Sequence, residues 1–504
     1  SQAGTIRYIT NKPEFGGFDA GFDASISKTE DGETSTSVEG FLNLPINDQM
    51  AARIAFYNDD QGGYIDNVEG TFTLDPEINP NSAVAGVVGP DATFTEANNA
   101  NLVEEDFNDA SYRGIRASFK YQINPDWSIL IQDQYQKLEA DGVFDFDPTV
   151  GDLDVQRFFE DELEDTFNQI SWTLEGRLGL LDVVYTGAYL DRQIDQSVDY
   201  TGYNETGAFI AYYTCTYDNP DYIVNYNLPV PSVVTENRQC LDPTKGAIID
   251  QQHTRNTHEI RFNTPQDWRL RFTGGFFYDD LEIETQDDFH YFANMDGGGA
   301  ALGFAPNAPI PEANNINPET RPDTVAFFND ITRTEEQYAF FGEASFDLIP
   351  NLLTFNAGGR FWFIDSDFTG SSNFANGIFQ GSVEPPQRGR DYDVSGGHTP
   401  EPFEQDGFDP RLTLSWTPAD SVLLYGTYST GFRPGGFNRG GGLPSVNPDF
   451  PTVNTTYETD NVKNYEIGWK TLLLDRTVRF NGNAYFIEWD DMQVSRFDPQ
   501  NVSI

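Results

Sequence analysis

The stretch Tyr338–Phe363 reads "YAFFGEASFDLIPNLLTFNAGGRFWF" and consists of two alternating segments on either side of a short turn, "LIPNL" (Leu348–Leu352). Successive side chains of a strand point to opposite faces, so this alternation predicts two strands that each have one apolar face. Glu343, Asp347 and Arg360 lie on the polar faces. The apolar or small residues of the opposite faces are Tyr338, Phe340, Gly342, Ala344, Phe346 and Leu348 in the first segment and Leu353, Phe355, Ala357, Phe361 and Phe363 in the second.

The length of these segments indicates what kind of sheet they belong to. Each is about ten residues or longer, whereas strands of globular proteins usually have about 5–6 residues. A tilted strand needs about 9–11 residues to cross a bilayer. The stretch "WRLRFTGGFFY" (Trp268–Tyr278) repeats both the alternation and the length. These strands therefore match the requirements of a membrane-spanning sheet.

The links between the predicted strands are of two kinds. The long connections include Asp59–Ala110, Gln196–Gln252, Glu284–Asp330 and Asp367–Gly407. Tight turns at one end and long loops at the other are typical of a transmembrane barrel, whereas a soluble sandwich mixes both at each end. The short links contain mostly Pro, Asn or Asp, which favour turns; they are Leu44–Asp48, Ile123–Trp127, Leu178–Asp182, Thr264–Trp268, Leu348–Leu352, Thr417–Ser421 and Leu472–Arg476.

Tryptophan positions and the strand count extend this prediction. Trp127 and Trp268 directly follow tight turns and Trp416 precedes one, as expected for an aromatic girdle at a membrane interface. We predict an all-β fold, a transmembrane antiparallel barrel with about fifteen strands in this chain. Bacterial barrels close with an even number of strands, so we expect further strands beyond the last predicted one, Thr477–Trp489.

Composition excludes some classes of function. Asp and Glu number 80 against 30 Lys and Arg, which gives a formal charge of −50 and disfavours a nucleic-acid-binding surface. We interpret the excess as a solvated surface. No run approaches the roughly 18 apolar residues of a transmembrane helix.

The chain has no motif that would indicate catalysis. It lacks H-E-x-x-H, G-x-S-x-G, Walker A and C-x-x-C patterns, and its histidines (His253, His258, His290 and His398) are scattered. We therefore predict no enzyme activity, no cofactor and no metal site. His253 and His258 are expected to face opposite sides of a sheet. The two cysteines, Cys215 and Cys240, favour one loop disulfide over two free thiols.

Four motifs, in the expected order along the chain, resemble those of TonB-dependent outer-membrane receptors. "GTIRYITNKP" (Gly4–Pro13) is similar to the closing segment of their plug domain. "LLYGTYSTGFRPGGFN" (Leu423–Asn438) resembles a strand that rises into an F-[RK]-x-G-G-F-N-like loop. "NYEIGWK" (Asn464–Lys470) and "AYFIEWDDMQV" (Ala484–Val494) resemble two later strands of the family.

The resemblance implies a barrel of about 22 strands whose lumen holds a plug. It implies that residues 1–16 are the end of the plug domain and a hinge, with Thr5–Thr10 the last plug strand, and that 17–504 form an incomplete barrel. We expect Phe18–Ile26 to be the first barrel strand, with Phe18, Phe22 and Ile26 facing lipid. The plug–barrel junction would contain Gly4, Thr5, Ile6, Thr10, Lys12 and Pro13.

The resemblance also implies a function and partners. It implies an active transporter in the outer membrane of a Gram-negative bacterium, which imports a scarce nutrient, with a ferric siderophore as the first candidate. A glycan, cobalamin or another organic ligand remains an alternative, and a passive porin-like channel is an alternative of another class. The implied partners are the TonB–ExbB–ExbD system, acting through a TonB box upstream of this chain, the nutrient, and outer-membrane lipid and lipopolysaccharide.

Candidate ligand-binding residues lie in two loops. By resemblance, the glycine-rich loop contributes Phe432, Arg433, Phe437, Asn438 and Arg439; a flexible lid is the alternative. Near the cysteines, Tyr212 and Tyr213 could stack on ligand rings, although packing within the loop is favoured. The acidic stretch Glu139–Asp165 contains Asp145, Asp147, Asp152 and Asp154, for which we favour a solvated loop over a Ca²⁺ site.

Overall fold

The computed structural model describes residues 9–86, 88–206, 214–215, 239–294, 322, 324–374, 390–391, 402–437, 454 and 456–494. Its main element is one 16-stranded sheet, in which fifteen strands follow each other in chain order and β18 pairs beside β17. Each described strand of this path runs antiparallel to its neighbours. No helix among the described residues has the length and hydropathy to cross a membrane.

The strands of the main path are β1 (Asp19–Lys28), β2 (Thr34–Asn47), β3 (Met50–Gln61), β8 (Ala110–Asn124), β9 (Trp127–Asp141), β11 (Glu162–Leu178), β12 (Leu181–Asp199), β14 (Lys245–Asn263), β15 (Leu270–Tyr291), β16 (Val325–Ile349), β17 (Leu353–Phe374), β19 (Phe403–Ala419), β20 (Val422–Arg433), β23 (Asp460–Leu473) and β24 (Val478–Asp490). The smaller elements are β4 (Asp66–Asn67), β5 (Thr71–Thr73), β6 (Thr93–Phe94), β7 (Glu96–Asn98), β10 (Asp154–Val155), α1 (Tyr203–Thr206), β13 (Gln239–Cys240), a 3₁₀ turn (Phe292–Asn294), β18 (Arg390–Asp391), β21 (Gly436–Phe437) and β22 (Thr456–Tyr457).

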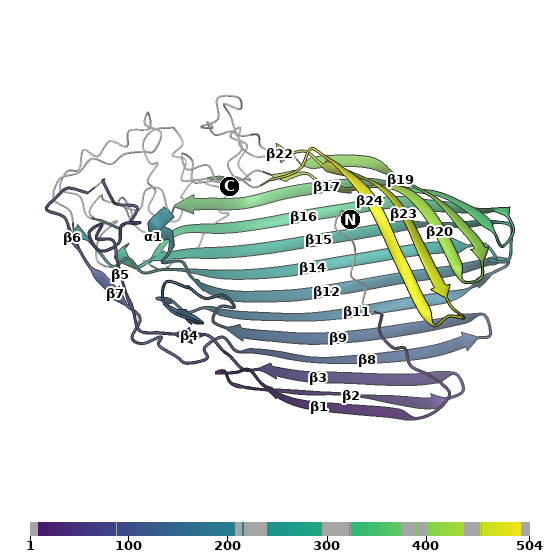
Figure 1. Ribbon diagram of the computed structural model, residues 1–504, viewed down its shortest axis with the longest axis horizontal. Helices are drawn as coiled ribbons and strands as arrows, with labels where there is room; N and C mark the ends of the chain where they lie inside the picture. Colours follow the sequence, from purple (N-terminus) through teal and green to yellow (C-terminus); the bar gives the residue numbers. More distant parts are fainter. Residues whose placement is uncertain are drawn as a thin grey trace.

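One end of the sheet has only short turns, and the long loops all lie at the other end, together with the short β1–β2 link of residues 29–33 (Figure 1). All seven predicted tight links join consecutive strands at the turn end, from β2–β3 to β23–β24. The four predicted long connections are the β3–β8, β12–β14, β15–β16 and β17–β19 loops at the loop end. The antiparallel, membrane-type sheet predicted from alternation and loop length is therefore confirmed, including its count of fifteen strands.

The two faces of the sheet differ as the sequence predicts. Phe340, Phe361 and Phe363 are exposed on one face, which we call the outer face. On the opposite face, the inner wall, Ala339 and Trp362 are buried. Trp362 lies between two exposed phenylalanines, so strand alternation alone decides its side. The outer face therefore presents aromatic and aliphatic side chains where a membrane-spanning barrel meets lipid.

Above this apolar belt, towards the loop end, the outer face becomes acidic. Glu139, Glu164, Asp195 and Asp250 are opposite one another in successive strand pairs, from β9 to β14. Glu139 lies on the outer face because it is an even number of residues from exposed Tyr135 on the same strand. Glu164, Asp195 and Asp250 share this face because each is directly opposite its neighbour in the set. We call these four residues the acidic row.

Three smaller predictions can be checked on the strands. The first predicted strand, Phe18–Ile26, corresponds to β1, and Phe22 is exposed on the outer face. Ile9 and Thr10 have no strand structure, and the rest of the predicted plug strand lies outside the described residues. His258 stacks on Tyr185 of the outer face, with ring centroids 6.1 Å apart, whereas His253 lies five residues away and hence on the inner wall.

Candidate functional site

Residues 9–17, which we call the strap, cross the inner wall near the turn end. The Thr10 hydroxyl accepts a hydrogen bond from Gln132 Nε2 of β9 at 3.2 Å. Lys12 Nζ forms an ion pair with Glu175 Oε1 of β11 at 3.1 Å. Figure 1 shows this segment passing across neighbouring strands towards β1. Two of the predicted junction residues therefore contact the inner wall.

One buried side chain of β2 holds the end of the strap. Asn43 is 1% exposed, and its Oδ1 accepts the backbone N–H of Glu14 at 2.9 Å. Its Nδ2 donates to the carbonyl oxygens of Glu14 and Gly17. Pro13, the third described junction residue, is buried. A single amide thus satisfies three backbone groups that would otherwise lack partners beside the wall.

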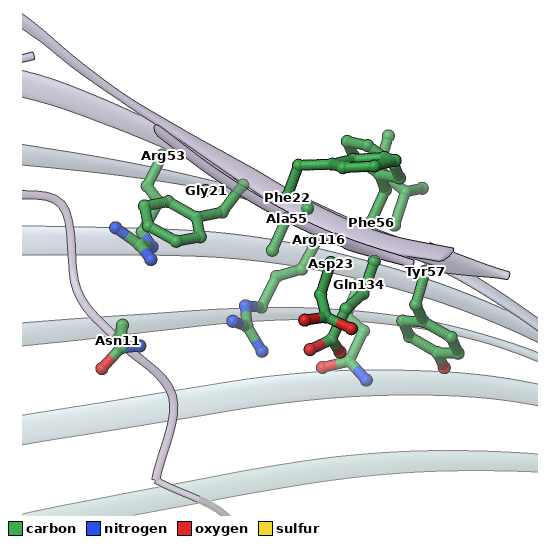
Figure 2. Close-up of a pocket in the computed structure, with 14 residues that line it drawn as sticks. Asn11, Gly21, Phe22, Asp23, Arg53, Ala55, Phe56, Tyr57, Arg116 and Gln134 are labelled. Carbon is green, nitrogen blue, oxygen red and sulfur yellow. The ribbon is translucent and has the colours of Figure 1, made fainter. Parts of the chain in front are cut away.

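Beside the strap, the inner wall contains a cavity of about 380 Å³. Figure 2 shows Arg53, Arg116, Asp23 and Gln134 on one side of the sheet and Phe22 on the other. The cavity residues come from the strap and from β1, β2, β3, β8 and β9: Asn11, Gly21, Phe22, Asp23, Glu39, Gly40, Phe41, Arg53, Ala55, Phe56, Tyr57, Ile115, Arg116 and Gln134.

A second part of the inner wall, towards the loop end, combines aromatic rings with arginine. The Phe432 ring of β20 stacks on Trp362 of β17, with centroids 3.7 Å apart and planes 12° apart. Trp362 Nε1 donates to Asp409 Oδ2 at 2.9 Å, which satisfies the buried indole. Arg360 of β17 lies over the Phe277 ring at 5.3 Å. Phe432 is half-buried, so this arrangement, the aromatic–arginine wall, leaves part of its ring accessible.

Next to this wall, the predicted loop residue Arg433 has an internal partner. Its Nε and Nη2 donate to Asp460 Oδ2 at 3.1 and 2.7 Å, and Nη2 also donates to the carbonyl of Gln493 at 2.9 Å. Asp460 has no exposed surface. These contacts join the end of β20 to the start of β23. The guanidinium therefore stabilises the base of the loop.

Phe437, another predicted ligand residue, lies in β21 beyond this ion pair. Its ring stacks on Phe368 of β17 at 5.7 Å and meets Phe403 of β19 edge-on at 6.3 Å. Asn438, Arg439, Tyr212 and Tyr213 lie outside the described residues, as do Gly4, Thr5 and Ile6.

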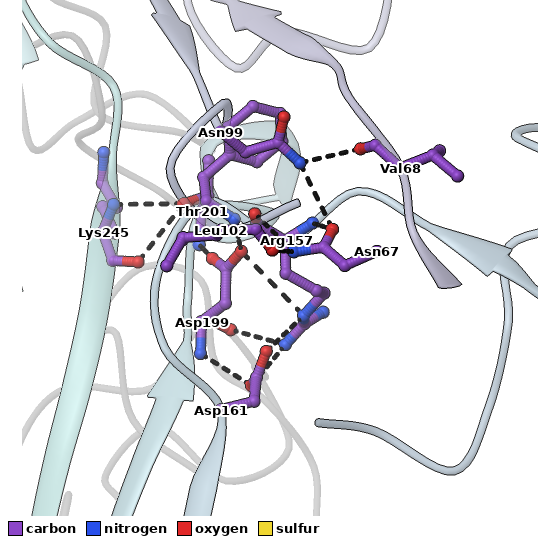
Figure 3. Close-up of polar contacts among 10 residues, drawn as sticks. Asn67, Val68, Asn99, Leu102, Arg157, Asp161, Asp199, Thr201 and Lys245 are labelled. Carbon is purple, nitrogen blue, oxygen red and sulfur yellow. Dashed lines mark hydrogen bonds and ion pairs between the residues drawn. The ribbon is translucent and has the colours of Figure 1, made fainter. Parts of the chain in front are cut away.

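The described loop segments at the loop end fold into a cap, which we define as residues 62–86, 88–109, 142–161, 200–206, 214–215 and 239–245. The Asn99 amide donates to Asn67 Oδ1 and to the carbonyl of Val68 (Figure 3). Asn67 Oδ1 also accepts the backbone N–H of Arg157 at 2.8 Å, which joins the β3–β8 loop to the β9–β11 loop. Buried amides of this kind specify loop structure because each must find a partner.

An ion pair connects the cap to the barrel strands. Arg157 Nε and Nη2 donate to Asp161 at 2.6 and 2.8 Å, and Asp161 accepts the backbone N–H of Asp199 at the end of β12 (Figure 3). Asp199 in turn accepts the backbone N–H of Phe158. Arg157 is the one basic residue of the acidic stretch Glu139–Asp165, and these contacts give it a structural role.

The cap is closed by a disulfide between Cys215 and Cys240. Both cysteines are buried and pack with Leu74 and Val84 of the β3–β8 loop. A disulfide across this separation of 25 residues stabilises by about 3 kcal/mol in the chain-entropy account. It therefore joins two parts of the β12–β14 connection and holds them against the β3–β8 loop.

Beside the disulfide lies a lysine with no exposed surface, Lys245 at the start of β14. Its Nζ donates to Asn204 Oδ1 and, at 3.3 Å, to Thr214 Oγ1, and lies 4.6 Å from the Tyr291 ring centroid. Burial lowers the pKa of Lys245 to about 7, an effect that Asp242 partly opposes. The amine is thus held by neutral acceptors.

Within the part of the chain that the structure describes, no group of three or more His, Cys, Asp or Glu side chains has the arrangement of a metal site. In the acidic stretch, Asp147 Oδ1 accepts hydrogen bonds from the backbone and hydroxyl of Thr149 at 2.8 and 2.6 Å. These bonds are those of an Asx turn and support the solvated-loop interpretation.

Sequence patterns alone did not indicate several of these residues. The partners Trp362 and Asp460, the arginines Arg53 and Arg116 and the buried Lys245 all come from segments read only as strands or loops. Alternation could have placed Trp362 on the inner wall, since Phe361 and Phe363 lie on either side of it. The pairing of Asp460 with Arg433 depends on strand register, which the sequence does not contain.

Comparison with known proteins decides the family. Residues 210–504 match the family model described as TonB dependent receptor-like, beta-barrel. This match covers more than half of the chain. The chain belongs to the TonB-dependent receptor family. Its members are receptors and transporters of the outer membrane, and the antiparallel sheet described above is their β-barrel.

Solved structures share this fold. The chain is similar to the ferric yersiniabactin uptake receptor FyuA from Yersinia pestis, with a TM-score of 0.60 and 11% identity over 96% of this chain and 56% of that one. It is similar to the siderophore receptor PiuA from Acinetobacter baumannii, with a TM-score of 0.51 and 12% identity over 94% and 57%. It is also similar to the ferric citrate transporter FecA, with a TM-score of 0.53 and 10% identity over 95% of this chain and 52% of that one. The chain spans about half the length of these TonB-dependent receptors.

Proposed function

We propose that this protein is an active transporter that imports a scarce nutrient through the outer membrane, with a ferric siderophore as the first candidate. The family supports the transport role. Structural relatives described as a ferric yersiniabactin uptake receptor and a siderophore receptor support the choice of iron chelate. Energy would come from the TonB–ExbB–ExbD system, and lipopolysaccharide would surround the extracellular end.

The observation that carries this proposal is the aromatic–arginine wall. Phe432 presents part of its ring to the lumen, and buried Trp362 fixes its orientation from behind. Arg360 keeps a positive charge on the same wall, with its Nη2 donating to Gln337 at 2.7 Å. Stacking and a nearby guanidinium together suit a ligand with aromatic or planar groups and negative charge. Ferric chelates with catecholate groups have these properties.

We also propose that residues 1–16 are the end of the plug domain. The contacts of Thr10 and Lys12 with β9 and β11 support this assignment, because they hold the strap across the inner wall. In this arrangement the plug precedes the strap and lies inside the barrel. The Asn43 anchor then marks the point where the chain leaves the lumen and enters β1.

Binding measurements on the purified protein test the ligand class. We expect quenching of tryptophan fluorescence by a ferric tris-catecholate, and weaker binding by about tenfold in Phe432→Ala and in Arg360→Gln. Phe363→Ala is the matched control, since its ring lies on the outer face of β17, the strand that carries Arg360. Its affinity should equal that of the unchanged protein.

Other results would point elsewhere. Saturable binding of an oligosaccharide or a cobalamin, with no response to ferric chelates, would replace iron chelate as the substrate. Steady ion conduction across a planar bilayer by the protein encoded by the complete gene would contradict active transport and support a passive channel.

A further inference from the structure

The cavity beside the strap contains two arginines that share one face of neighbouring strands. Ala55 of β3 is opposite Arg116 of β8, and Arg53 is opposite Ser118. Arg53 and Arg116 are therefore diagonal neighbours on the inner wall. Figure 2 shows both guanidinium groups on the same side of the sheet, with Asn11 of the strap opposite them.

These arginines have no anionic partner at contact distance in the part of the chain that the structure describes. Among the described residues, no carboxylate lies within ion-pair distance of Arg53 or Arg116, and Arg53 Nε has no hydrogen-bond partner. Arg53 is only 8% exposed, and its guanidinium lies over the Phe41 ring at 3.9 Å from the centroid. A nearly buried arginine is normally paired with a carboxylate, since leaving its donors unsatisfied is costly.

The acids of the cavity do not fill this role. Asp23 and Glu39 are opposite each other on β1 and β2, and both line the same cavity. Neither is in contact with a guanidinium among the described residues. Two like charges on diagonal positions repel each other. An additional anion between Arg53 and Arg116 would remove this repulsion and satisfy the free donors.

We propose that this cavity is a binding site for a carboxylate group on the inner wall of the barrel. Arg53 and Arg116 hold the carboxylate through their planar donor forks, and the Gln134 amide, directly opposite Arg116, borders it. A cavity of about 380 Å³ is at the small end of ligand sites and accepts a carboxylate side chain or a small dicarboxylate. The inference goes beyond the proposed function and does not depend on the nature of the imported nutrient.

Calorimetric titration of the purified protein in detergent tests the site with two probes. Succinate represents a free dicarboxylate, and the blocked peptide acetyl-Gly-Glu-Gly-amide represents an acidic side chain of a polypeptide. We expect binding of at least one probe that weakens with added salt and falls at least about tenfold in Arg53→Gln and Arg116→Gln. The affinity of Arg53→Lys should lie between those of the unchanged protein and Arg53→Gln, because lysine retains the positive charge but lacks the planar guanidinium donors.

Controls separate a specific site from general charge. Arg411→Gln removes an exposed inner-wall arginine outside the cavity and should leave the affinity unchanged. Each variant must retain heat-modifiable migration on a detergent gel, which shows that the barrel is folded. The peptide Gly-Gln-Gly, with the same blocking groups, should not bind.

The outcomes assign the source or overturn the site. Binding of the peptide alone identifies a polypeptide segment in the lumen as the occupant, and binding of succinate alone identifies a solute. No binding of either probe, or equal binding in Arg53→Gln and Arg411→Gln, would overturn the proposal. Failure of ferric chelate binding would leave this result unaffected.

Discussion

At the residue scale, Lys245 makes the stability of the cap depend on pH. Its pKa in the folded protein is about 7, lower than in an unfolded chain, because burial disfavours the charged amine. Above about pH 7 the unfolded state therefore binds more protons than the folded state. The free energy of unfolding rises with pH from about 7 towards 10.

This dependence can be measured by thermal unfolding between pH 6.5 and 9.5. The unchanged protein should gain up to about 1.4 kcal/mol per pH unit relative to Lys245→Met over this range. Lys28→Met, a change at an exposed lysine of β1, should leave the slope as it is. An identical slope in the Lys245 variant would contradict the structural role given to this amine.

Arg433 makes a second residue-scale prediction. It donates two hydrogen bonds to Asp460, which has no exposed surface. Arg433→Ala should lower the free energy of unfolding by about 1.5–3 kcal/mol, because hydrogen bonds to a charged group are lost. Chemical denaturation measures this change. Arg411→Ala, at an exposed position, should change stability by less than about 0.5 kcal/mol.

Residue-scale prediction from sequence works where strand alternation decides the outcome. It placed Phe340 and Phe363 on the outer face, as the structure confirms. It could not find the partners of Arg433 or Lys245, because these come from segments distant in sequence. For Phe432, Arg433 and Phe437, resemblance pointed to a loop, whereas the described contacts are internal. Their contact with a ligand stays a prediction.

At the element scale, the acidic row places like charges opposite each other on neighbouring strands. Lys137 forms ion pairs with Glu139 and Glu164 at 2.7 and 3.0 Å. Asp195 and Asp250 are directly opposite, and among the described residues no cation lies within ion-pair distance of them. Like charges in this geometry destabilise the strand pair. Cross-strand repulsion is therefore concentrated between β12 and β14.

Replacing one of these acids should stabilise the protein. Asp195→Asn removes the repulsion and is expected to raise the free energy of unfolding by about 0.2–1 kcal/mol. Asp48→Asn, at an exposed turn position at the other end of the sheet, is the control. Because screening also weakens repulsion, added NaCl should stabilise the unchanged protein more than the Asp195 variant. A lower midpoint of unfolding for Asp195→Asn would contradict this account.

The disulfide gives a second element-scale prediction. Cys215→Ser with Cys240→Ser should raise hydrogen exchange in residues 62–109 and 239–245, since the cap loses about 3 kcal/mol of stabilisation. The barrel strands at the turn end should keep their protection, and the protein should remain heat-modifiable. Unchanged exchange in the cap would show that its buried amides hold it without the disulfide.

At the scale of the whole molecule, the sequence predicted the architecture better than the site. Strand length, alternation and the separation of short turns from long loops are local properties, so the antiparallel barrel strands could be predicted. The cap could not, because Asn67, Asn99 and Arg157 join loops distant in sequence through buried polar contacts. The inner-wall sites depend in the same way on register between strands.

The function proposed for this TonB-dependent receptor barrel is the active import of an iron chelate. The most direct measurement is uptake of radioactive iron, supplied as a ferric catecholate, by cells that lack their own ferric-chelate receptors and express the complete gene. We predict saturable uptake that requires TonB and is abolished by a protonophore. Uptake that persists without TonB and rises linearly with chelate concentration would contradict the account.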